Sequence, residues 1–329
     1  MTDVAVRPLR DPDLPALLEV HKRRNDFGGR WFTNPYAGGK EARWEDLTPA
    51  QRWLHGGPWM DPQLLALHVR RYAEAEGAIL VAERGGKLVG EAELWPAKEP
   101  LPLGAYLGVE NLVADPPGDA AVERALLDAA VREAAGRGVR ALDIAPLHAG
   151  GTPALLTEAG FVLHLENRTV HLEAGRRPKA PEYGVLSTAP TLTDLEDTVL
   201  LDHREPADFR LGNLGNEWSS GLLKEVSRPF GALLRVRFAD IGVTGSVHTW
   251  LPEREAEVDL WVTTAGLGNA PWLRQAAAAA VDHVSKDVPA ARVRTTVRSH
   301  LVPALRAIGF EDGAEPDPWL RRPITVRNL

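Results

Sequence analysis

The sequence predicts an α/β (α+β) protein built from two copies of one structural unit. The chain has 329 residues, which is the length of two domains of ordinary size. Strand-like and helix-like segments alternate along it, and the same landmark residues return in the same order in the second half. We therefore expect two domains, residues 1–174 and 183–329, joined by a linker at 175–182.

The repeated landmarks are glycines, leucines and a Gly-Phe ending that keep their order in both halves. The corresponding residues are Asp13 and Asp194, Gly77 and Gly231, Gly90 and Gly245, Leu112 and Leu260, Leu126 and Leu273, and Phe161 and Phe310. Several landmarks in one order are hard to obtain by chance, so the pattern indicates an internal duplication.

The first copy begins with an alternating strand at 4–9, followed by a helix that opens at Asp11-Pro12-Asp13. Residues 22–76 hold four of the ten tryptophans and are expected to form helices over a pocket. A hairpin over 77–95 should turn at Gly85-Gly86. A strand (106–114), a helix (120–135), a strand (139–144), a short helix (153–159) and a hairpin (162–172) should complete the copy.

The second copy restarts after the charged, proline-containing linker with a strand at 183–188 and a helix from 192. Further on, Val258, Leu260 and Val262 alternate with polar or aromatic residues, which predicts a strand with one buried face. Two glycines at 266 and 268 then allow a sharp turn into an alanine-rich helix, with Asn269 or Ala270 as the N-cap candidate. The backbone amides in the first turn of this helix can bind an anion. Alternatively, the two glycines only allow the chain to turn between the strand and the helix.

Composition excludes several functional classes. The net charge of −7 gives no reason to expect a nucleic acid or an anionic membrane as a partner. The absence of cysteine excludes disulfides, thiolate zinc sites and a cysteine nucleophile, and the ten scattered histidines suggest no metal site. No apolar run has the length of a signal-peptide core or a membrane span, so a soluble cytoplasmic protein is expected.

The order of elements and three specific segments together resemble one known family. The segments are the opening Val-Arg-Pro-Leu at 6–9, the Leu-Trp-Val strand before the turn at 266–270, and the Gly-Phe endings at 160–161 and 309–310. They resemble the GNAT superfamily of acetyl-CoA-dependent N-acetyltransferases, twice in tandem over nearly the whole chain. The resemblance implies two GNAT-like domains, each a mixed, mostly antiparallel central sheet flanked by helices. It also implies an intramolecular pseudo-dimer, as a monomer or a homodimer.

The resemblance further implies where coenzyme A lies. In this family the glycine turn holds the pyrophosphate through backbone amides, and the strand before it splays from its neighbour to receive the pantetheine arm. The residues implied are, along pantetheine, Val262, Thr263 and Thr264 and, around pyrophosphate, Gly266, Leu267, Gly268, Asn269 and Ala270. One departure is Ala265, which stands where the family usually has arginine or glutamine.

The first copy lacks the glycines of this turn and has Asp119 at the expected helix N-cap. A carboxylate there would bind the same amides as a pyrophosphate and repel it, so we expect no coenzyme A in copy one. Both copies also lack the tyrosine that the family uses as an acid, since Leu156 and Leu305 occupy its positions. Ser299 or His300 can replace it, or each can serve only as part of a helix cap.

Four acidic residues occupy every second position before Trp261, namely Glu253, Glu255, Glu257 and Asp259. In one strand they share a face, either as a solvated surface or as a functional row. Next to the predicted cofactor turn, Glu257 or Asp259 is the candidate to accept the proton of an attacking amine, and the row would attract a cation. The expected function is acetyl transfer from acetyl-CoA to a small cationic amine. The alternative is a non-catalytic tandem GNAT protein that binds an acyl-CoA or another metabolite.

Overall fold

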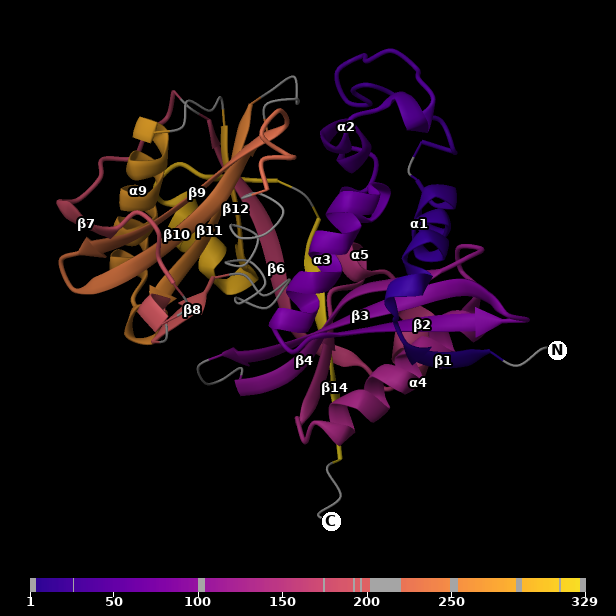
Figure 1. Cartoon of the computed structure of the whole chain (residues 1–329). Coiled ribbons are helices and arrows are strands. Elements are labelled where there is room, and N and C mark those ends of the chain that lie inside the picture. The colour runs from indigo at the N-terminus through magenta and orange to yellow at the C-terminus, as the bar shows by residue number, and fades with distance from the viewer. Residues whose placement is uncertain are drawn as a thin grey trace.

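In the computed structural model, strands from both halves of the chain join in one twisted sheet with helices on its faces (Figure 1). The structure describes residues 4–325 apart from 26, 100–103, 174, 192, 196, 202–219, 249–253, 288–291 and 314. Within these residues the sheet contains 14 strands. The first strand of each copy lies at an edge of this sheet, β1 (Ala5–Pro8) at one end and β7 (Tyr183–Ser187) at the other. The two copies therefore meet in its middle.

The first copy follows the expected order of elements. After β1 come α1 (Leu14–Arg23), α2 (Pro49–Trp53), α3 (Pro62–Glu74), β2 (Ala78–Arg84), β3 (Lys87–Glu99), β4 (Gly104–Ala114), α4 (Ala120–Gly136), β5 (Ala141–Ile144), α5 (Pro146–Ala149), α6 (Pro153–Glu158) and β6 (Val162–Glu173). The β2–β3 turn is confirmed at Gly85 and Gly86, whose φ angles of 58° and 76° favour glycine.

The second copy repeats this order with a shorter helical section in the described residues. After β7 come β8 (Thr198–Leu200), β9 (Ser227–Val236), β10 (Ala239–His248), β11 (Glu255–Thr263), α9 (Ala270–Asp287), β12 (Arg292–Arg298), α10 (Val302–Arg306), β13 (Glu311–Asp312) and β14 (Asp317–Pro323). The helix expected from residue 192 is only a 3-10 turn over Thr193–Leu195, and β8 follows it directly.

The hairpin expected over 162–172 is wrong, because β6 is one continuous strand. It pairs antiparallel with β12, β13 and β14, all of which belong to the second copy. Its partners therefore come from the other half of the chain, about 120 to 160 residues away. No turn near Asn167 is needed to pair it. A local pattern of alternating residues cannot distinguish this pairing from a hairpin.

The two copies exchange their last strands. β14 pairs with β5 of copy one, placing Arg321 opposite Asp143, and β6 pairs with β12 of copy two, placing Leu172 opposite Val293. β6 and β14 also pair with each other, so the seam lies between them. The two exchanged pairings mirror one another, as a pseudo-twofold relation between duplicated halves requires. The bounds 1–174 and 183–329 stay a prediction.

Each hydrophobic core contains residues from the other copy. Val170 of β6 is buried in the core formed mainly by β9–β12 and α9. In return, Leu320 of β14 and Ile324 pack in the core formed by β2–β5, α4 and α6. Burying apolar side chains is the main favourable term in folding. Neither core is therefore complete without the exchanged strand.

A buried ion pair joins the copies at the same seam. Asp143 of β5 is fully buried and accepts hydrogen bonds from Arg321 Nε and Nη2 at 2.8 and 2.7 Å and from Trp319 Nε1 at 2.8 Å. Three donors to one carboxylate compensate for much of its lost hydration. Separating β14 from β5 would leave this carboxylate without its partners.

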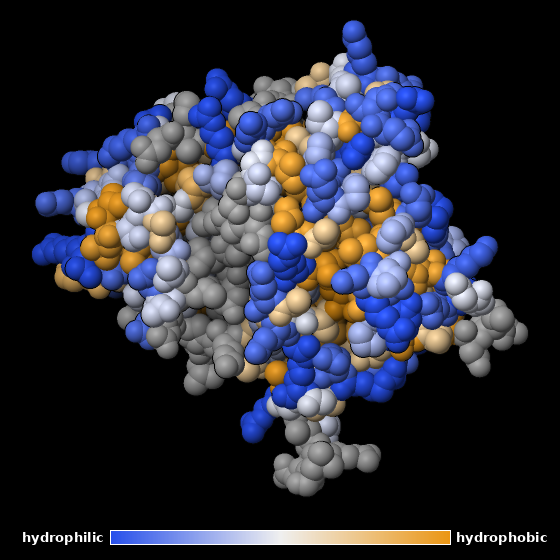
Figure 2. Space-filling model, in the orientation of Figure 1, coloured by the Kyte–Doolittle hydropathy of each residue, from blue (hydrophilic) through white to orange (hydrophobic). Residues whose placement is uncertain are grey.

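The helices divide between the faces of the sheet. In the first copy α1 and α3 cover one face and α4 the other, and α9 packs on the corresponding strands of copy two (Figure 1). Figure 2 shows an apolar area between α1 and α3, where partly buried Leu9, Leu14 and Leu88 pack against Leu17 and Leu65. None of the helices in the described ranges has the length and hydropathy to cross a membrane.

We predict that residues 1–177 and 178–329 do not fold when expressed separately. Each fragment would lose one exchanged strand, and the first would also keep Asp143 buried without Arg321, which costs about 3–5 kcal/mol. Co-expression should recover a heterodimer that unfolds cooperatively, as measured by size-exclusion chromatography and thermal unfolding. Two soluble fragments that each unfold cooperatively as monomers would contradict the exchange.

Candidate functional site

The glycine turn of copy two contains two glycines, Gly266 and Gly268. Packing requires a glycine at the first position and not at the second. β11 leads through a 3-10 turn over Thr264–Gly266 into α9. Gly266 is buried, and a Cβ atom there would overlap the ring of Trp272. Gly268 is exposed, and no atom lies within 4 Å of the position that its Cβ would take. The turn therefore leaves open space beside Gly268.

The start of α9 is capped by a neutral side chain. Asn269 Oδ1 accepts a hydrogen bond from the Trp272 amide at 3.0 Å, which confirms Asn269 as the N-cap. Pro271, in the first turn, has no amide hydrogen to satisfy. Thr264 and Ala270 are exposed, and Leu267 is half-buried. An anion at this helix end would meet no opposing charge from the cap.

β11 and β12 diverge where the resemblance implies a slot. They pair in parallel only from Glu255 to Glu257, although β11 continues to Thr263 and β12 to Arg298. The equivalent strands of copy one, β4 and β5, also pair over a short stretch, from Leu107 to Val109. The predicted splay beside Val262 and Thr263 is present in the backbone.

In this structure, β8 lies in the splay of copy two. Its residues pair antiparallel with β11, Thr198 opposite Thr263 and Val199 opposite Val262. The next residue, Leu201, bridges both strands, since its amide donates to Leu260 O at 2.8 Å and its carbonyl accepts from Arg298 N at 2.9 Å. The backbone groups of β11 that were expected to face pantetheine are therefore paired with the chain itself.

Of the acidic row, Glu255, Glu257 and Asp259 lie on β11, and the first two form ion pairs. Ala256, Val258 and Leu260 face the core as expected. Buried Glu255 forms ion pairs with Arg292 and Arg294, and Glu257 Oε2 accepts from Arg294 Nη2 at 2.6 Å. These arginines lie on β12, directly opposite.

Asp259 differs from its neighbours in the row. It is half-buried, and the hydroxyl of Thr244 on β10 lies 3.5 Å from its Oδ2. Position 253 lies outside the described residues. No local pattern in the sequence indicated that arginines on β12 neutralise Glu255 and Glu257.

In copy one, a carboxylate occupies the corresponding helix end and caps its amides. Asp119 Oδ1 accepts from the amides of Ala121 and Val122, as expected for the N-cap, and Arg84 binds both carboxylate oxygens at 2.6 and 3.2 Å. The hydrogen bond from Arg84 lowers the pKa of Asp119 below its ordinary value, and the capped amides add to this effect against partial burial. This end therefore carries a fixed carboxylate at neutral pH.

The positions of the absent tyrosine lie in the two cores. Leu156 and Leu305 are fully buried among apolar side chains. Of the suggested replacements, Ser299 donates to Glu166 Oε1 at 2.8 Å. Burial, together with the charge of Arg298, lowers the pKa of His300, so that its imidazole is neutral at physiological pH.

Sequence reasoning missed a buried polar network in copy one. On β3, Glu91 contacts His21 Nε2 at 2.5 Å, and Glu93 contacts His68 Nε2 at 3.1 Å and Trp59 Nε1 at 2.8 Å. These contacts join α1, α3 and the segment between α2 and α3 to the sheet. The alternation of Glu91, Glu93 and Trp95 with alanine and leucine was a signal that could have located it.

The pKa values of the two carboxyl groups in this network are shifted in opposite directions. Burial raises the pKa of Glu91, and the charge of His21 only partly opposes this. Burial also acts to raise the pKa of Glu93, but the charge and hydrogen bond of His68 together bring it below the ordinary value. The network fastens the helices of copy one to β3.

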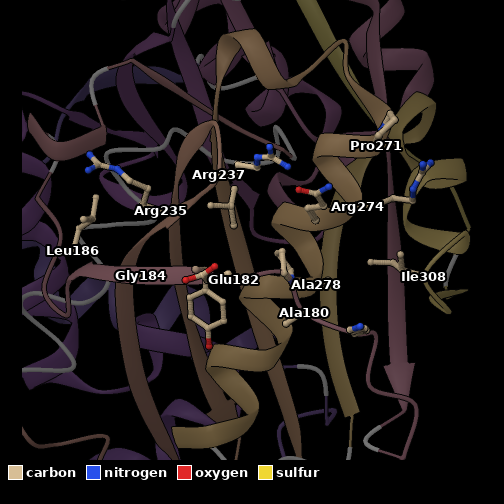
Figure 3. Close-up of a pocket in the computed structure, with 15 residues that line it drawn as sticks. Ala180, Glu182, Gly184, Leu186, Arg235, Arg237, Pro271, Arg274, Ala278 and Ile308 are labelled. Carbon is tan, nitrogen blue, oxygen red and sulfur yellow. The ribbon is translucent and has the colours of Figure 1, made fainter.

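A basic groove of about 1020 Å³ runs along α9 (Figure 3). It is bounded by the linker, β7, the end of β9 and the first turns of the helix. The charged residues in its lining are Lys179, Glu182, Arg235, Arg237 and Arg274. Arg235 is paired with Asp240, and the guanidinium of Arg237 lies over the ring of Phe238. The groove adjoins Pro271, so its positive charge lies close to the glycine turn.

Comparisons with known proteins agree on the fold. No known protein family matches the sequence, and no curated protein matches it. A GCN5-related N-acetyltransferase from Anabaena variabilis has a similar structure, with a TM-score of 0.63 at 11% identity over 98% of this chain and 73% of its own. One from Kribbella flavida gives 0.56 at 14% identity over 98% and 72%.

A tandem GNAT protein from the clavulanic acid biosynthesis pathway is similar over 99% of this chain and all of its own, with a TM-score of 0.50 at 15% identity. The chain therefore has the GNAT fold, the fold of the GCN5-related N-acetyltransferases. It has this fold twice, in tandem, as the resemblance implied.

Proposed function

We propose that the protein is an N-acetyltransferase that moves an acetyl group from acetyl-CoA to a small cationic amine, using the second copy. The observation that carries the proposal is the turn of copy two, where Gly268 leaves open space at an uncharged helix end. The fold supports acetyl transfer in general. The first copy, with its helix end closed by Asp119 and Arg84, then has a structural role.

In copy two, the residues of the glycine turn fit the pyrophosphate of coenzyme A, whereas β8 competes with its pantetheine arm. Gly266 to Ala270 would hold the pyrophosphate, and the basic groove beside α9 adds positive charge nearby. Val262 to Thr264 would face the pantetheine arm, but β8 is paired with Val262 and Thr263 in this structure. When bound, acetyl-CoA would supply an acetyl group activated as a thioester.

β8 therefore has to leave the splay before the cofactor can enter it fully. Its pairing is short, three residues on β11 and one bridge to β12. If β8 never leaves, the second candidate is favoured, a tandem GNAT protein that does not transfer acetyl groups. The behaviour of β8 in the presence of acetyl-CoA separates the two.

We assign the proton-accepting role to Asp259. An amine must lose a proton when it is acylated, and a carboxylate near the thioester can take it. Glu257 is paired with Arg294 at 2.6 Å, which makes it a poor base, and Asp259 lies nearer to the end of β11 that leads into the glycine turn. Glu257, neutralised by Arg294, then has a structural role.

Gly268→Val should abolish acetyl-CoA binding without unfolding the protein, because the new side chain fills space that no residue occupies. Isothermal titration calorimetry should show one site per chain in the wild type and none in the variant. Gly266→Val is the matched control, and it should lower the thermal midpoint because it collides with Trp272. Two sites in the wild type, or unchanged affinity in Gly268→Val, would contradict the assignment.

Acetyl-CoA and β8 should compete. In the wild type, saturating acetyl-CoA should speed hydrogen exchange at the Leu201 amide, which now bonds to Leu260 O. Val199→Pro, which removes a donor from β8, should raise acetyl-CoA affinity about tenfold by lowering the population of the docked state. Slower exchange at Leu201 on addition of acetyl-CoA, or weaker binding by a folded Val199→Pro protein, would show that β8 is a fixed part of the structure.

Asp259→Asn should lower kcat about 100-fold while acetyl-CoA affinity stays within about twofold, as expected for loss of a general base. Glu257→Gln should have a smaller effect. Turnover of cationic amines should also fall as salt rises, since the attraction is screened. Steady-state kinetics with a panel of amines would measure kcat and its dependence on salt. Full activity in both variants, or a preference for acidic acceptors, would refute the role of the row.

A further inference from the structure

Three polar side chains stand in a row where the two copies meet. Asn167 of β6 lies directly opposite Arg298 of β12 on one side and Asp317 of β14 on the other. Directly opposed residues project from the same face of a sheet, with Cβ atoms about 4.5–5.5 Å apart. All three are buried, with exposed fractions of 0%, 6% and 7% for Asn167, Arg298 and Asp317. The row runs from a cation through an amide to an anion.

Asn167 is fully buried, and neither its amide nitrogen nor its amide oxygen has a hydrogen-bond partner among the described residues. A buried amide that makes no hydrogen bond costs free energy, and such groups are rare in folded proteins. Leucine, of similar size, would fit a core position without this cost. The amide can therefore accept a partner that the described residues do not supply.

Asp317 is in a similar position. One carboxylate oxygen, Oδ2, lies 2.8 Å from His148 Nε2, whereas Oδ1 is buried without a partner among the described residues. The His148 side chain is 44% exposed, so Asp317 lies one side chain below the surface. At the other end of the row, Arg298 Nη2 donates to Leu200 O, a residue of β8. The row thus leads from the surface near His148 to the slot of copy two.

We propose that Asn167 and Asp317 bind the acceptor molecule, and that the acceptor carries an ammonium group next to a hydroxyl or carbonyl oxygen. Asp317 Oδ1 and Asn167 Oδ1 accept hydrogen bonds from the ammonium, and Asn167 Nδ2 donates to the oxygen. The oxygen end points toward Arg298, whose positive charge disfavours the ammonium there. This polarity matches the order of the three side chains.

This inference rests on the proposed function and narrows its substrate class. A simple polyamine offers no acceptor for Asn167 Nδ2, which would stay buried without a partner. An amino alcohol, including an aminoglycoside-like molecule, satisfies both ends of the amide. The site lies on β6 and β14, two and three strands from β11. The bound group is therefore either the reacting amine or a second amine about 10–15 Å from it, from the strand spacing.

The test uses the full-length protein without acetyl-CoA, so that it does not depend on acetyl transfer. The probe is 1-amino-2-propanol, and the observable is the side-chain amide resonance of Asn167 in a ¹⁵N-labelled sample. Isobutylamine replaces the hydroxyl by a methyl group, and 1,2-propanediol replaces the amine by a hydroxyl. We expect the probe to shift the Asn167 resonance with saturation, isobutylamine to bind about fivefold more weakly, and the diol not to bind.

Two variants separate a binding role from a structural one. For the variants, binding of the probe is measured by calorimetric titration, because Asn167→Leu has no side-chain amide at this position. Asn167→Leu and Asp317→Asn should each abolish binding, and Asn167→Leu should leave the thermal midpoint equal or raise it. Thr169→Val is the matched control, since Thr169 lies on the same strand and pairs with Thr296 at 3.0 Å; it should retain binding. No shift with 1-amino-2-propanol, equal binding of isobutylamine, or a clearly lower thermal midpoint for Asn167→Leu overturns the proposal. If the protein binds the probe but does not bind acetyl-CoA, the proposed function is refuted and the binding site at Asn167 and Asp317 is retained.

Discussion

The structure depends on the exchange of β6 and β14 between the two halves of the chain. Asp143 in copy one is buried with Arg321 and Trp319 of copy two, and Leu172 of copy one lies against Val293 of copy two. A buried carboxylate is tolerated only with its partners, so this pairing fixes how the halves meet. The continuous sheet, the shared cores and the row at Asn167 all follow from it.

The region expected to hold the cofactor is obstructed differently in the two copies. In copy one, a charge from its own sequence closes the helix end, through Asp119 and Arg84. In copy two the helix end stays open beside Gly268, but β8 pairs along the slot. The carboxylate of Asp119 is always present at the helix end of copy one, whereas β8 is held in copy two by only a few hydrogen bonds, which can break. That difference is why we place the proposed activity in copy two.

Buried polar groups of two kinds occur on the face of the sheet opposite α4 and α9. In copy one, Glu93 with His68 and Trp59 is well supplied with hydrogen bonds and fastens helices to β3, whereas Glu91 Oε2 has no partner among the described residues. At the seam, the Asn167 amide has no partner in the described part of the chain, and neither has Asp317 Oδ1. A buried network whose polar groups are all hydrogen-bonded contributes to stability and needs no further partner. A buried polar group without a hydrogen bond can instead indicate a site for a ligand.

The sequence by itself determined the duplication, the order of elements and the local chemistry of the turns. Gly85 with Gly86, Asn269 as the cap of α9 and Asp119 as the cap of α4 follow from short-range rules, because a turn or a helix end depends on residues a few positions apart.

Only the tertiary structure decided which strands pair across the two halves. The alternation in β6 was compatible with a hairpin, and nothing near Glu255 in the sequence indicated that it would form ion pairs with Arg292 and Arg294. The placement of β8 against Val262 and of Asp317 beside Asn167 joins residues about 60 and 150 positions apart. Such contacts are set by how whole strands pack, and a single sequence carries no local signal for them.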